Sequence, residues 1–385
     1  MDGAYRDLIP PPSRIVVGLS GGVDSAVAAL LLLRAGYQVE GLFMKNWEDD
    51  DTLTHCAAAE DLAAAQEVAR RLSIPLHQIN FAARYRDEVF SYCLDELRAG
   101  RTPNPDILCN RHIKFDAFLG HALDHLGAAA VATGHYARLR RISDRPPRLL
   151  RGLDRDKDQS YFLHGVPAAA FHRTLFPLGG LTKDRVRAEA RDAGLPNHDR
   201  PDSTGICFIG ERNFGEFIGR YIPDAPGPIV TDTGDVIGHH RGLHHYTVGQ
   251  RRGLGIGGSH AGDGPWYVAR KDAEDHALVV VEGHDHPLLL AQVLETGPPH
   301  WLGPAPSPGA HLTAQIRYRQ LPQPCSVVYD DDGGLTVLFE SPQRAPAAGQ
   351  YVVLYHGDTC LGGAPIRRHL PLEASSRRVC GTLAG

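Results

Sequence analysis

The sequence predicts an α/β protein with a doubly wound parallel sheet, followed by a small β domain and a C-terminal β-barrel. Three observations lead to this prediction. Short apolar runs alternate with helical patterns in the first third of the chain, which is typical of parallel strands connected by helices. A glycine-rich turn joins the first strand to the first helix. Beyond about residue 212, glycine, proline and short β-prone runs replace the helical patterns.

The elements of the parallel sheet come first along the chain. Gly36 would end the first helix, because glycine readily takes the conformation that follows a helix. The predicted strands are 15–17, 39–44, 74–81 and 128–133, and the predicted helices are 26–34, 57–72, 85–98 and 115–126. In such a sheet a nucleotide binds at the carboxyl ends of the strands.

The later elements are mostly strands. An edge strand is predicted at 149–152, and a surface helix at 182–193 with Thr182 as its N-cap. The β-prone runs are 227–237, 245–248, 266–269, 278–282, 311–318, 326–330, 335–339 and 351–355. We predict a catalytic domain at 1–211, a small β domain at 212–286, a barrel at 287–372 and a disordered tail at 373–385, with a boundary in the proline-rich stretch 287–308.

Composition indicates an ordinary soluble chain of two or three domains. It has 385 residues, of which 42% are hydrophobic and 22% charged. No apolar run approaches the roughly 20 residues of a spanning helix, and the first residues do not read as a signal peptide. We therefore predict a cytoplasmic protein without a membrane partner. The net charge of −5 does not indicate a nucleic-acid partner, although residues 138–151 hold six arginines and one aspartate.

The glycine-rich turn is a candidate phosphate site. Its residues are Gly18, Leu19, Ser20, Gly21, Gly22, Val23, Asp24 and Ser25. Gly21 and Gly22 permit close approach of another backbone, and the N–H groups at the helix start attract an anion. Asp24 does not favour an anion, so it either orients the loop or faces a metal ion. The alternative is a glycine turn that binds nothing.

This turn is not a Walker A loop, since no lysine precedes its last serine. The string SGGVDS instead resembles the PP-loop of ATP pyrophosphatases, which cleave ATP between the α and β phosphates and transfer AMP to a substrate oxygen. Met44 and Gly134 also lie at the ends of predicted strands, where they could contact adenine. Each of them could equally be a packing or turn residue.

Two of the seven cysteines lie in segments that suggest chemistry. Cys109 follows two prolines and Asp106, which stiffen a loop or begin a helix, and Asn104 and Asp106 could read the polar edge of a base. Cys207 lies between glycines and close in sequence to arginines, which lower the pKa of a thiol. The alternative for each is an incidental buried cysteine. The remaining cysteines are interpreted as bystanders: Cys56, Cys93, Cys325, Cys360 and Cys380.

The cysteine and histidine patterns also limit the metal sites that the chain could hold. The absence of any CxxC pair argues against a zinc ribbon and against a cysteine-only iron–sulfur cluster. A histidine cluster at 239–245 could bind a metal, but such a cluster in a loop rich in glycine and arginine is usually solvated. We therefore assign no metal to protein ligands.

Seven motifs, taken together, resemble the bacterial tRNA-specific 2-thiouridylases of the MnmA type. In chain order they are GLSGGVDS, GLFMKNW, GRTPNPDILCN, ATGHY, LLRGLDRDKDQSYFL, DSTGICFIGERNF and GQRRGLGIGG. The resemblance runs from about Arg14 to about Pro371. It implies an adenine nucleotide alpha hydrolase-like fold and a tRNA-uridine 2-sulfurtransferase that uses ATP with Mg²⁺. The implied reaction adenylates O2 of the wobble uridine, at position 34, and replaces it with sulfur, giving 2-thiouridine, AMP and pyrophosphate.

The resemblance also implies roles for individual residues. Cys207 would carry a persulfide from an upstream sulfur donor, and Cys109 would release its terminal sulfur. This would leave a transient Cys109–Cys207 disulfide for a reductant to open. Asp106 would be the general acid/base. Residues 18–25, Met44 and Gly134 would bind ATP. The implied contacts with the tRNA anticodon stem-loop are Asn104, Pro105, Asp106, Lys157, Asp158, Gln159, Arg317 and Tyr318.

Other functions remain open from the sequence. A PP-loop amidotransferase-like ligase would add ammonia and would not need Cys109 and Cys207. A thiolase acting on cytidine would typically use CxxC cluster ligands, which this sequence lacks. A non-catalytic protein would bind ATP and tRNA without forming AMP. The four arginines Arg140, Arg141, Arg145 and Arg148 are hypothesised to contact phosphate.

Overall fold

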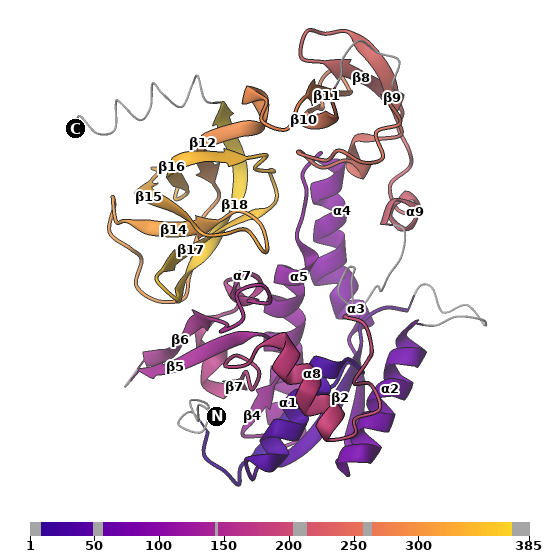
Figure 1. The fold of residues 1–385 in the computed structure, drawn as a ribbon, viewed down its shortest axis with the longest axis vertical. Helices are drawn as coiled ribbons and strands as arrows, with labels where there is room; N and C mark the ends of the chain where they lie inside the picture. Colours follow the sequence, from indigo (N-terminus) through magenta and orange to yellow (C-terminus); the bar gives the residue numbers. More distant parts are fainter. Residues whose placement is uncertain (1–8, 49–56, 143–144, 203–213, 257–263, 372–385) are drawn as a thin grey trace.

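The computed structural model describes residues 9–48, 57–142, 145–202, 214–256 and 264–371. Figure 1 shows a parallel-sheet domain at the bottom, a barrel at the upper left and a small β sheet at the upper right. The predicted fold class is therefore confirmed. Cys56, Cys207, Cys380 and the predicted disordered tail lie outside the described residues. Within the described ranges, no helix is long and apolar enough to cross a membrane.

Five parallel strands form the first sheet, in the order β3-β2-β1-β4-β7. They are β1 (Arg14–Gly18), β2 (Gln38–Lys45), β3 (Leu76–Asn80), β4 (Ala130–Ala132) and β7 (Thr174–Leu175). The strand order reverses between β1 and β4, and this reversal opens a crevice at the carboxyl ends of the strands. The glycine-rich turn follows β1 directly, so the fold places it at this switch point.

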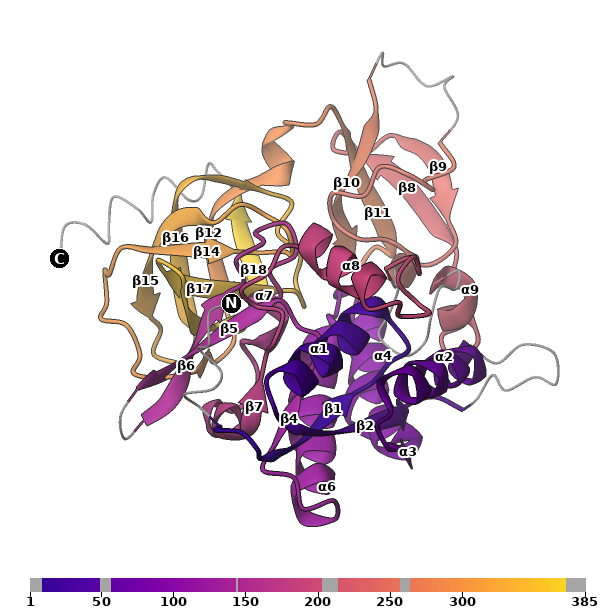
Figure 2. The same cartoon turned by 60° about the horizontal axis from the view of Figure 1, so that its bottom comes forward.

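Helices cover both faces of the sheet (Figure 2). One layer contains α1 (Val23–Arg34), α2 (Ala57–Leu72) and α8 (Lys183–Asp192). Ile15 and Val17 of β1 pack in this layer, whereas Val16 packs in the opposite layer, as strand alternation requires. Thr182 caps α8 as predicted, because its hydroxyl accepts a hydrogen bond from the Arg185 N–H.

Two helical segments on the second layer differ from the prediction. The first consists of α3 (Ala82–Tyr85), a π-helical stretch (Arg86–Phe90) and α4 (Ser91–Arg98). The second consists of α5 (Pro105–Leu108), a π-helical stretch (Cys109–Phe118) and α6 (Leu119–Asp124). It begins ten residues before the predicted start at 115, because Pro105 occupies the first helical position, where its missing N–H costs nothing. Cys109 therefore lies on a helix.

The small β domain is a four-stranded sheet in the order β10-β11-β8-β9. Helix α9 (Phe214–Gly219) precedes its strands, which are β8 (Gly227–Thr231), β9 (Val236–His240), β10 (Trp266–Asp272) and β11 (Ala277–Glu282). The predicted strand 227–237 is wrong as one element, because a turn divides it into β8 and β9. The predicted strand 245–248 is also wrong: a short 3-10 turn covers Leu243–His245 instead.

Six antiparallel strands close the C-terminal barrel, since β12 pairs with both β16 and β18. The strands are β12 (Leu290–Thr296), β14 (Leu312–Gln315), β15 (Gln323–Tyr329), β16 (Leu335–Arg344), β17 (Tyr351–His356) and β18 (Thr359–Pro371), with β13 (His300–Trp301) paired to β18. The sequence did not predict β12 or β18. The first lies inside the proline-rich stretch, and the second contains two glycines and two prolines.

A hairpin of the first domain continues the barrel sheet. Strands β5 (Ala137–Ile142) and β6 (Arg145–Arg151) pair with each other, and Leu150 of β6 pairs with Thr359 of β18. The predicted edge strand 149–152 is therefore paired on both sides, which corrects that expectation. Val353, Tyr355 and Cys360 of the barrel also join the hydrophobic core beneath the parallel sheet. The barrel thus packs directly on the parallel-sheet domain.

Candidate active site

The turn after β1 has the geometry of an anion cradle. Gly21 has φ +78°, and a Cβ there would lie 2.6 Å from the Asp61 carbonyl oxygen, so the position requires glycine. Gly22 is the N-cap of α1 and has no side chain to cap the helix. The Ser25 hydroxyl accepts the Ser20 N–H and donates to the Gly22 carbonyl, which holds the turn closed. The first N–H groups of α1 therefore point out of the turn, where an anion would bind.

Asp24 orients this turn rather than standing open to solvent. Lys183 Nζ donates to both of its carboxylate oxygens at 2.8 Å, and the Tyr136 hydroxyl donates to one of them at 2.7 Å. A Cβ on Gly134 would lie 2.9 Å from the Ser25 nitrogen, so Gly134 lets β4 approach the start of α1. Met44 is buried beside Gly18. The structure thus brings the predicted ATP residues together at one end of the sheet.

Asp202 joins three cations at the edge of this cradle. One oxygen accepts from Lys157 Nζ at 2.7 Å, and the other lies 2.7 Å from Lys183 Nζ and 2.9 Å from Arg187 Nη2. Lys183 therefore bridges Asp24 and Asp202. Sequence reasoning missed both Lys183 and Asp202, because their partners are far apart in the chain. The only available signal was that Asp24 needed a cation beside the phosphate loop.

The Asp202 ion pairs predict a specific loss of stability in acid. Burial alone raises the pKa of Asp202, but hydrogen bonds from Lys157 and Lys183 outweigh it and lower the pKa to about 2. Because the folded pKa lies below the unfolded one, the pairs stabilise the protein above about pH 4, and this stabilisation is lost as pH falls toward about 2. In thermal unfolding, the Tm deficit of Asp202→Asn relative to wild type should therefore shrink over that range. The exposed neighbour Asp199→Asn is the control. A deficit that stays constant down to pH 2 would contradict the prediction.

The helix that begins at Pro105 carries the first cysteine. Asn104 precedes it as N-cap with extended backbone angles, and Asp106 lies in its first turn. Asp106 and Cys109 are three residues apart, so they lie on the same face of the helix. Asp106 is partly exposed, whereas Cys109 is fully buried. Asp106 is therefore accessible to solvent, whereas the neighbouring thiol is not.

An aromatic cluster that includes Phe217 of α9 belongs to the same hydrophobic core as Cys109. Trp47 contacts Phe90 and Phe217 edge-on, with ring centroids 4.8 and 5.5 Å apart, and Tyr221 stands 4.8 Å from Phe90. Cys207 lies outside the described residues; in the sequence it is preceded by Asp202, which is bonded to Lys183 beside the turn after β1, and followed by α9 of this cluster. The described residues on both sides of Cys207 in the sequence therefore belong to the candidate site.

The two stretches predicted to contact tRNA lie beside each other. Tyr318 packs against Phe162, which follows Lys157-Asp158-Gln159 in α7 (Ser160–Leu163), with ring centroids 4.6 Å apart. Asp158 is buried and accepts hydrogen bonds from Gly152 and Ser160, and the Gln159 side chain accepts the Tyr136 N–H. These two side chains have internal partners, so their contact with tRNA stays a prediction. Arg140, Arg141, Arg145 and Arg148 are exposed on the β5–β6 hairpin.

Cys93, Cys325 and Cys360 are also buried, and none of them forms a disulfide. Burial raises the pKa of Cys93 and of Cys325 to about 12, and it also raises the pKa of Cys360. A thiol with such a pKa is a poor nucleophile near neutral pH. Cys93 lies on α4, in the same core as Cys109. Their interpretation as bystanders is therefore consistent with their surroundings.

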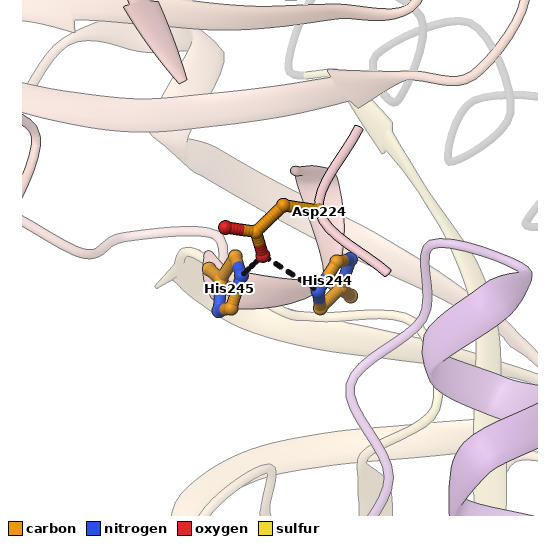
Figure 3. A group of neighbouring side chains, drawn as sticks. All are labelled: Asp224, His244 and His245. Carbon is orange, nitrogen blue, oxygen red and sulfur yellow. Dashed lines mark hydrogen bonds and ion pairs between the residues drawn. The ribbon is translucent and has the colours of Figure 1, made fainter. Parts of the chain in front are cut away.

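The histidine cluster of the small β domain is an ion-pair network. Figure 3 shows Asp224, His244 and His245 pointing toward one another, with their ligand atoms within 4.8 Å. One Asp224 oxygen lies 2.6 Å from His245 Nε2 and 3.9 Å from His244 Nε2, and Arg241 donates to the other at 3.0 Å. Burial lowers the pKa of His244 to about 4, so this ring is neutral. Because the Arg241 guanidinium donates to the same carboxylate, it opposes a metal ion there.

Comparisons with known proteins cover nearly the whole chain. Family models match residues 13–211 (tRNA methyl transferase HUP domain), 215–282 (tRNA methyl transferase PRC-barrel domain) and 291–366 (aminomethyltransferase β-barrel domain). A tRNA-specific 2-thiouridylase MnmA from Halorhodospira halophila is 61% identical over 95% of this chain and 96% of its own. The protein of that name from Alkalilimnicola ehrlichii is 58% identical over 94% and 99%, and that from Citrobacter koseri 53% over 94% and 98%.

Proposed function

The chain belongs to the tRNA-specific 2-thiouridylase family, and we propose that it catalyses ATP-dependent 2-thiolation of the wobble uridine, position 34, in tRNA. The observation that carries this proposal is the position of Cys109. It lies on the helix behind Asp106 and shares a core with α9, while the phosphate cradle occupies the other end of the Cys207 segment. This arrangement supports a site that combines phosphate chemistry with sulfur chemistry. The family models bear descriptions that mention methyl transfer, but the 2-thiouridylase relatives that match nearly the whole chain support thiolation instead.

The first step would activate the oxygen that sulfur replaces. Uracil O2 attacks the α phosphate of ATP, pyrophosphate leaves, and Asp106 accepts the proton lost from N3 of the base. The α1 N-terminus and Lys183 supply positive charge beside the phosphates. Mg²⁺ bound with ATP would neutralise further phosphate charge, and Asp24 is the carboxylate of the cradle that could help to hold it. Adenylation is necessary because oxygen by itself is a poor leaving group.

The second step would transfer the sulfur. Cys207 carries a persulfide received from an upstream donor. The Cys109 thiolate attacks its inner sulfur, the persulfide S–S bond breaks, and the terminal sulfur leaves as hydrosulfide. A Cys109–Cys207 disulfide forms, so the two cysteines supply the two electrons that reduce the sulfur. Hydrosulfide then attacks C2 of the base and AMP departs with O2. A reductant must afterwards open the disulfide.

The tRNA would approach across the junction of the catalytic domain and the barrel. Asn104, Pro105 and Asp106 lie on one side of this junction, and Arg317 and Tyr318 on the other. The uridine must leave the anticodon stack to reach a buried thiol, as in other base-modifying enzymes. Tyr318 offers an aromatic face, and Arg317 and Lys157 offer positive charge. Because the proposed substrate is tRNA, a cytoplasmic location is part of the proposal.

The test is mass spectrometry of nucleosides from unmodified tRNA incubated with the protein, ATP, Mg²⁺ and a persulfide donor. We expect a gain of one sulfur on the wobble uridine, one AMP per sulfur, and no product without ATP. If the tRNA stays unmodified while the enzyme transfers AMP to another substrate, the proposal is overturned in favour of a ligase. Binding of tRNA and ATP without AMP would support the non-catalytic alternative.

A further inference from the structure

A turn of the barrel holds the loop that leads into the Cys109 helix. This turn, residues 345–350 between β16 and β17, is called the barrel turn below. The Thr102 N–H donates to the Ala348 carbonyl at 2.8 Å. Gln350 Nε2 donates to the carbonyl oxygens of Thr102 at 3.0 Å and Pro103 at 3.1 Å. The barrel therefore binds the main chain of this loop directly.

One glutamine amide contacts three consecutive residues of the loop. Besides the two carbonyls, Gln350 Oε1 accepts a hydrogen bond from Asn104 Nδ2 at 3.3 Å. Two of the loop residues, Pro103 and Pro105, have no N–H, so the loop can form few hydrogen bonds of its own. Its carbonyl groups need donors from elsewhere. Gln350 supplies those donors immediately before the helix with Asp106 and Cys109 begins.

The close approach of the two backbones requires glycine in the barrel turn. Gly349 has φ +89°, which other residues rarely adopt. A Cβ at this position would lie 2.9 Å from both the nitrogen and the oxygen of Thr102 and 3.0 Å from Arg101 Cβ. Even the smallest side chain would therefore push the loop away. The contact between the barrel turn and the loop therefore depends on the main chain of both.

The other end of the barrel turn is fixed as well. Arg317 Nη2 donates to the carbonyl oxygens of Arg344 at 2.7 Å and Ala345 at 2.6 Å. The Ala345 N–H donates to the Leu289 carbonyl at 2.6 Å, and Ala345 packs in a core with residues of the small β domain. Arg317 and the core shared with the small β domain thus fix the end of the barrel turn that does not contact the loop. Their position can therefore affect the position of residues 102–104.

We propose that Gln350 is a positioning residue, which fixes residues 102–104 so that Asp106 and Cys109 are presented to the target base. The barrel then completes the active site in addition to contacting tRNA. The identity of the base rests on the proposed function, whereas the effect of Gln350 on Cys109 does not. Arg317, which is predicted to contact tRNA, holds the same turn, so tRNA would bind a barrel that is already connected to the reactive helix.

The experiment measures alkylation of individual cysteines in the full chain without substrates, by iodoacetamide and peptide mass spectrometry. The variants are Gln350→Ala and Gln350→Glu, and the matched control is Gln292→Ala, a barrel glutamine whose amide binds only the exposed Glu340 carbonyl among the described contacts. Loss of the donated hydrogen bonds should raise Cys109 alkylation about tenfold or more in both variants. Cys325 and Cys360, buried in the barrel, should keep their wild-type rates.

Two results would overturn the proposal. One is a Cys109 rate equal to that of wild type. The other is an equal rise at Cys109, Cys325 and Cys360, which would mean that the barrel has merely loosened. A second readout is the thiolation assay, in which Gln350→Ala should lower kcat at least tenfold and leave the Kd for tRNA within about twofold of wild type. If wild type fails to thiolate tRNA, the proposed function falls, while the alkylation comparison still decides the role of Gln350.

Discussion

Cys109→Ser is expected to lower thiolation from a persulfide donor on the order of 10³-fold or more, because a serine hydroxyl cannot cleave the persulfide S–S bond. The activation step needs no thiol, so the variant should still release about one pyrophosphate per tRNA in a single turnover. The measurement is a single-turnover assay that follows pyrophosphate and 2-thiouridine together. Cys207→Ser should likewise release pyrophosphate while forming little 2-thiouridine. The double variant should form 2-thiouridine no more slowly than either single variant, since the two thiols act as a unit.

Inorganic sulfide distinguishes this assignment from a structural role of Cys109. Its sulfur is already reduced, so it can attack the adenylated base without help from either cysteine. Excess sulfide should therefore restore product to Cys109→Ser and to Cys207→Ser. Cys93→Ser, which changes a neighbour in the same core, should keep wild-type turnover with the persulfide donor. Loss of pyrophosphate release in Cys109→Ser would show that the substitution had damaged the fold of the site instead.

The predicted parallel sheet agrees with the structure because its signals are local. The apolar run before Gly18 predicts β1, and the strong helix formers after Gly22 predict α1. Helix α2 has the predicted bounds, 57–72, since its amphipathic pattern is unbroken. The barrel was less predictable. Strands β12 and β18 are stabilised by pairing across the closed sheet, and their own residues include turn formers that outweigh the β signal.

In the candidate site, too, residues that depend on distant partners could not be predicted from local sequence signals. The phosphate turn and the two cysteine segments have local signatures, so the sequence predicts them. Lys183 and Gln350 have none, because their roles depend on residues more than a hundred positions away. A lysine at the start of a surface helix and a glutamine in a hairpin turn are ordinary in composition. Only the folded chain brings Lys183 to Asp24 and Gln350 to the loop before Cys109.

Gly22→Asp is expected to raise the KM for ATP at least about 100-fold, since a carboxylate in the cradle faces the phosphates and such like-charge contacts cost several kcal/mol. The same substitution should not destabilise the protein. Gly22 has φ −79°, an angle open to any residue, and a Cβ there meets only the Ser20 hydroxyl, at 3.3 Å. Aspartate is a favoured N-cap and its charge suits a helix N-terminus. We therefore expect the Tm of Gly22→Asp to equal or exceed that of wild type, although the variant binds ATP much more weakly.

Gly22→Asn is the matched control, because asparagine has the size and capping ability of aspartate without its charge. Its KM for ATP should lie much closer to wild type than that of Gly22→Asp, and the difference between the two variants should narrow in high salt. Equal losses in both variants would indicate that any side chain blocks the cradle and that charge is irrelevant. Unchanged ATP binding in Gly22→Asp would show that this turn is not the phosphate site. The proposed role of the α1 N-terminus in adenylation would then be wrong as well. A binding loss limited to the charged variant, with stability kept in both variants, is the outcome that indicates an anion site, since a steric block would affect both variants alike.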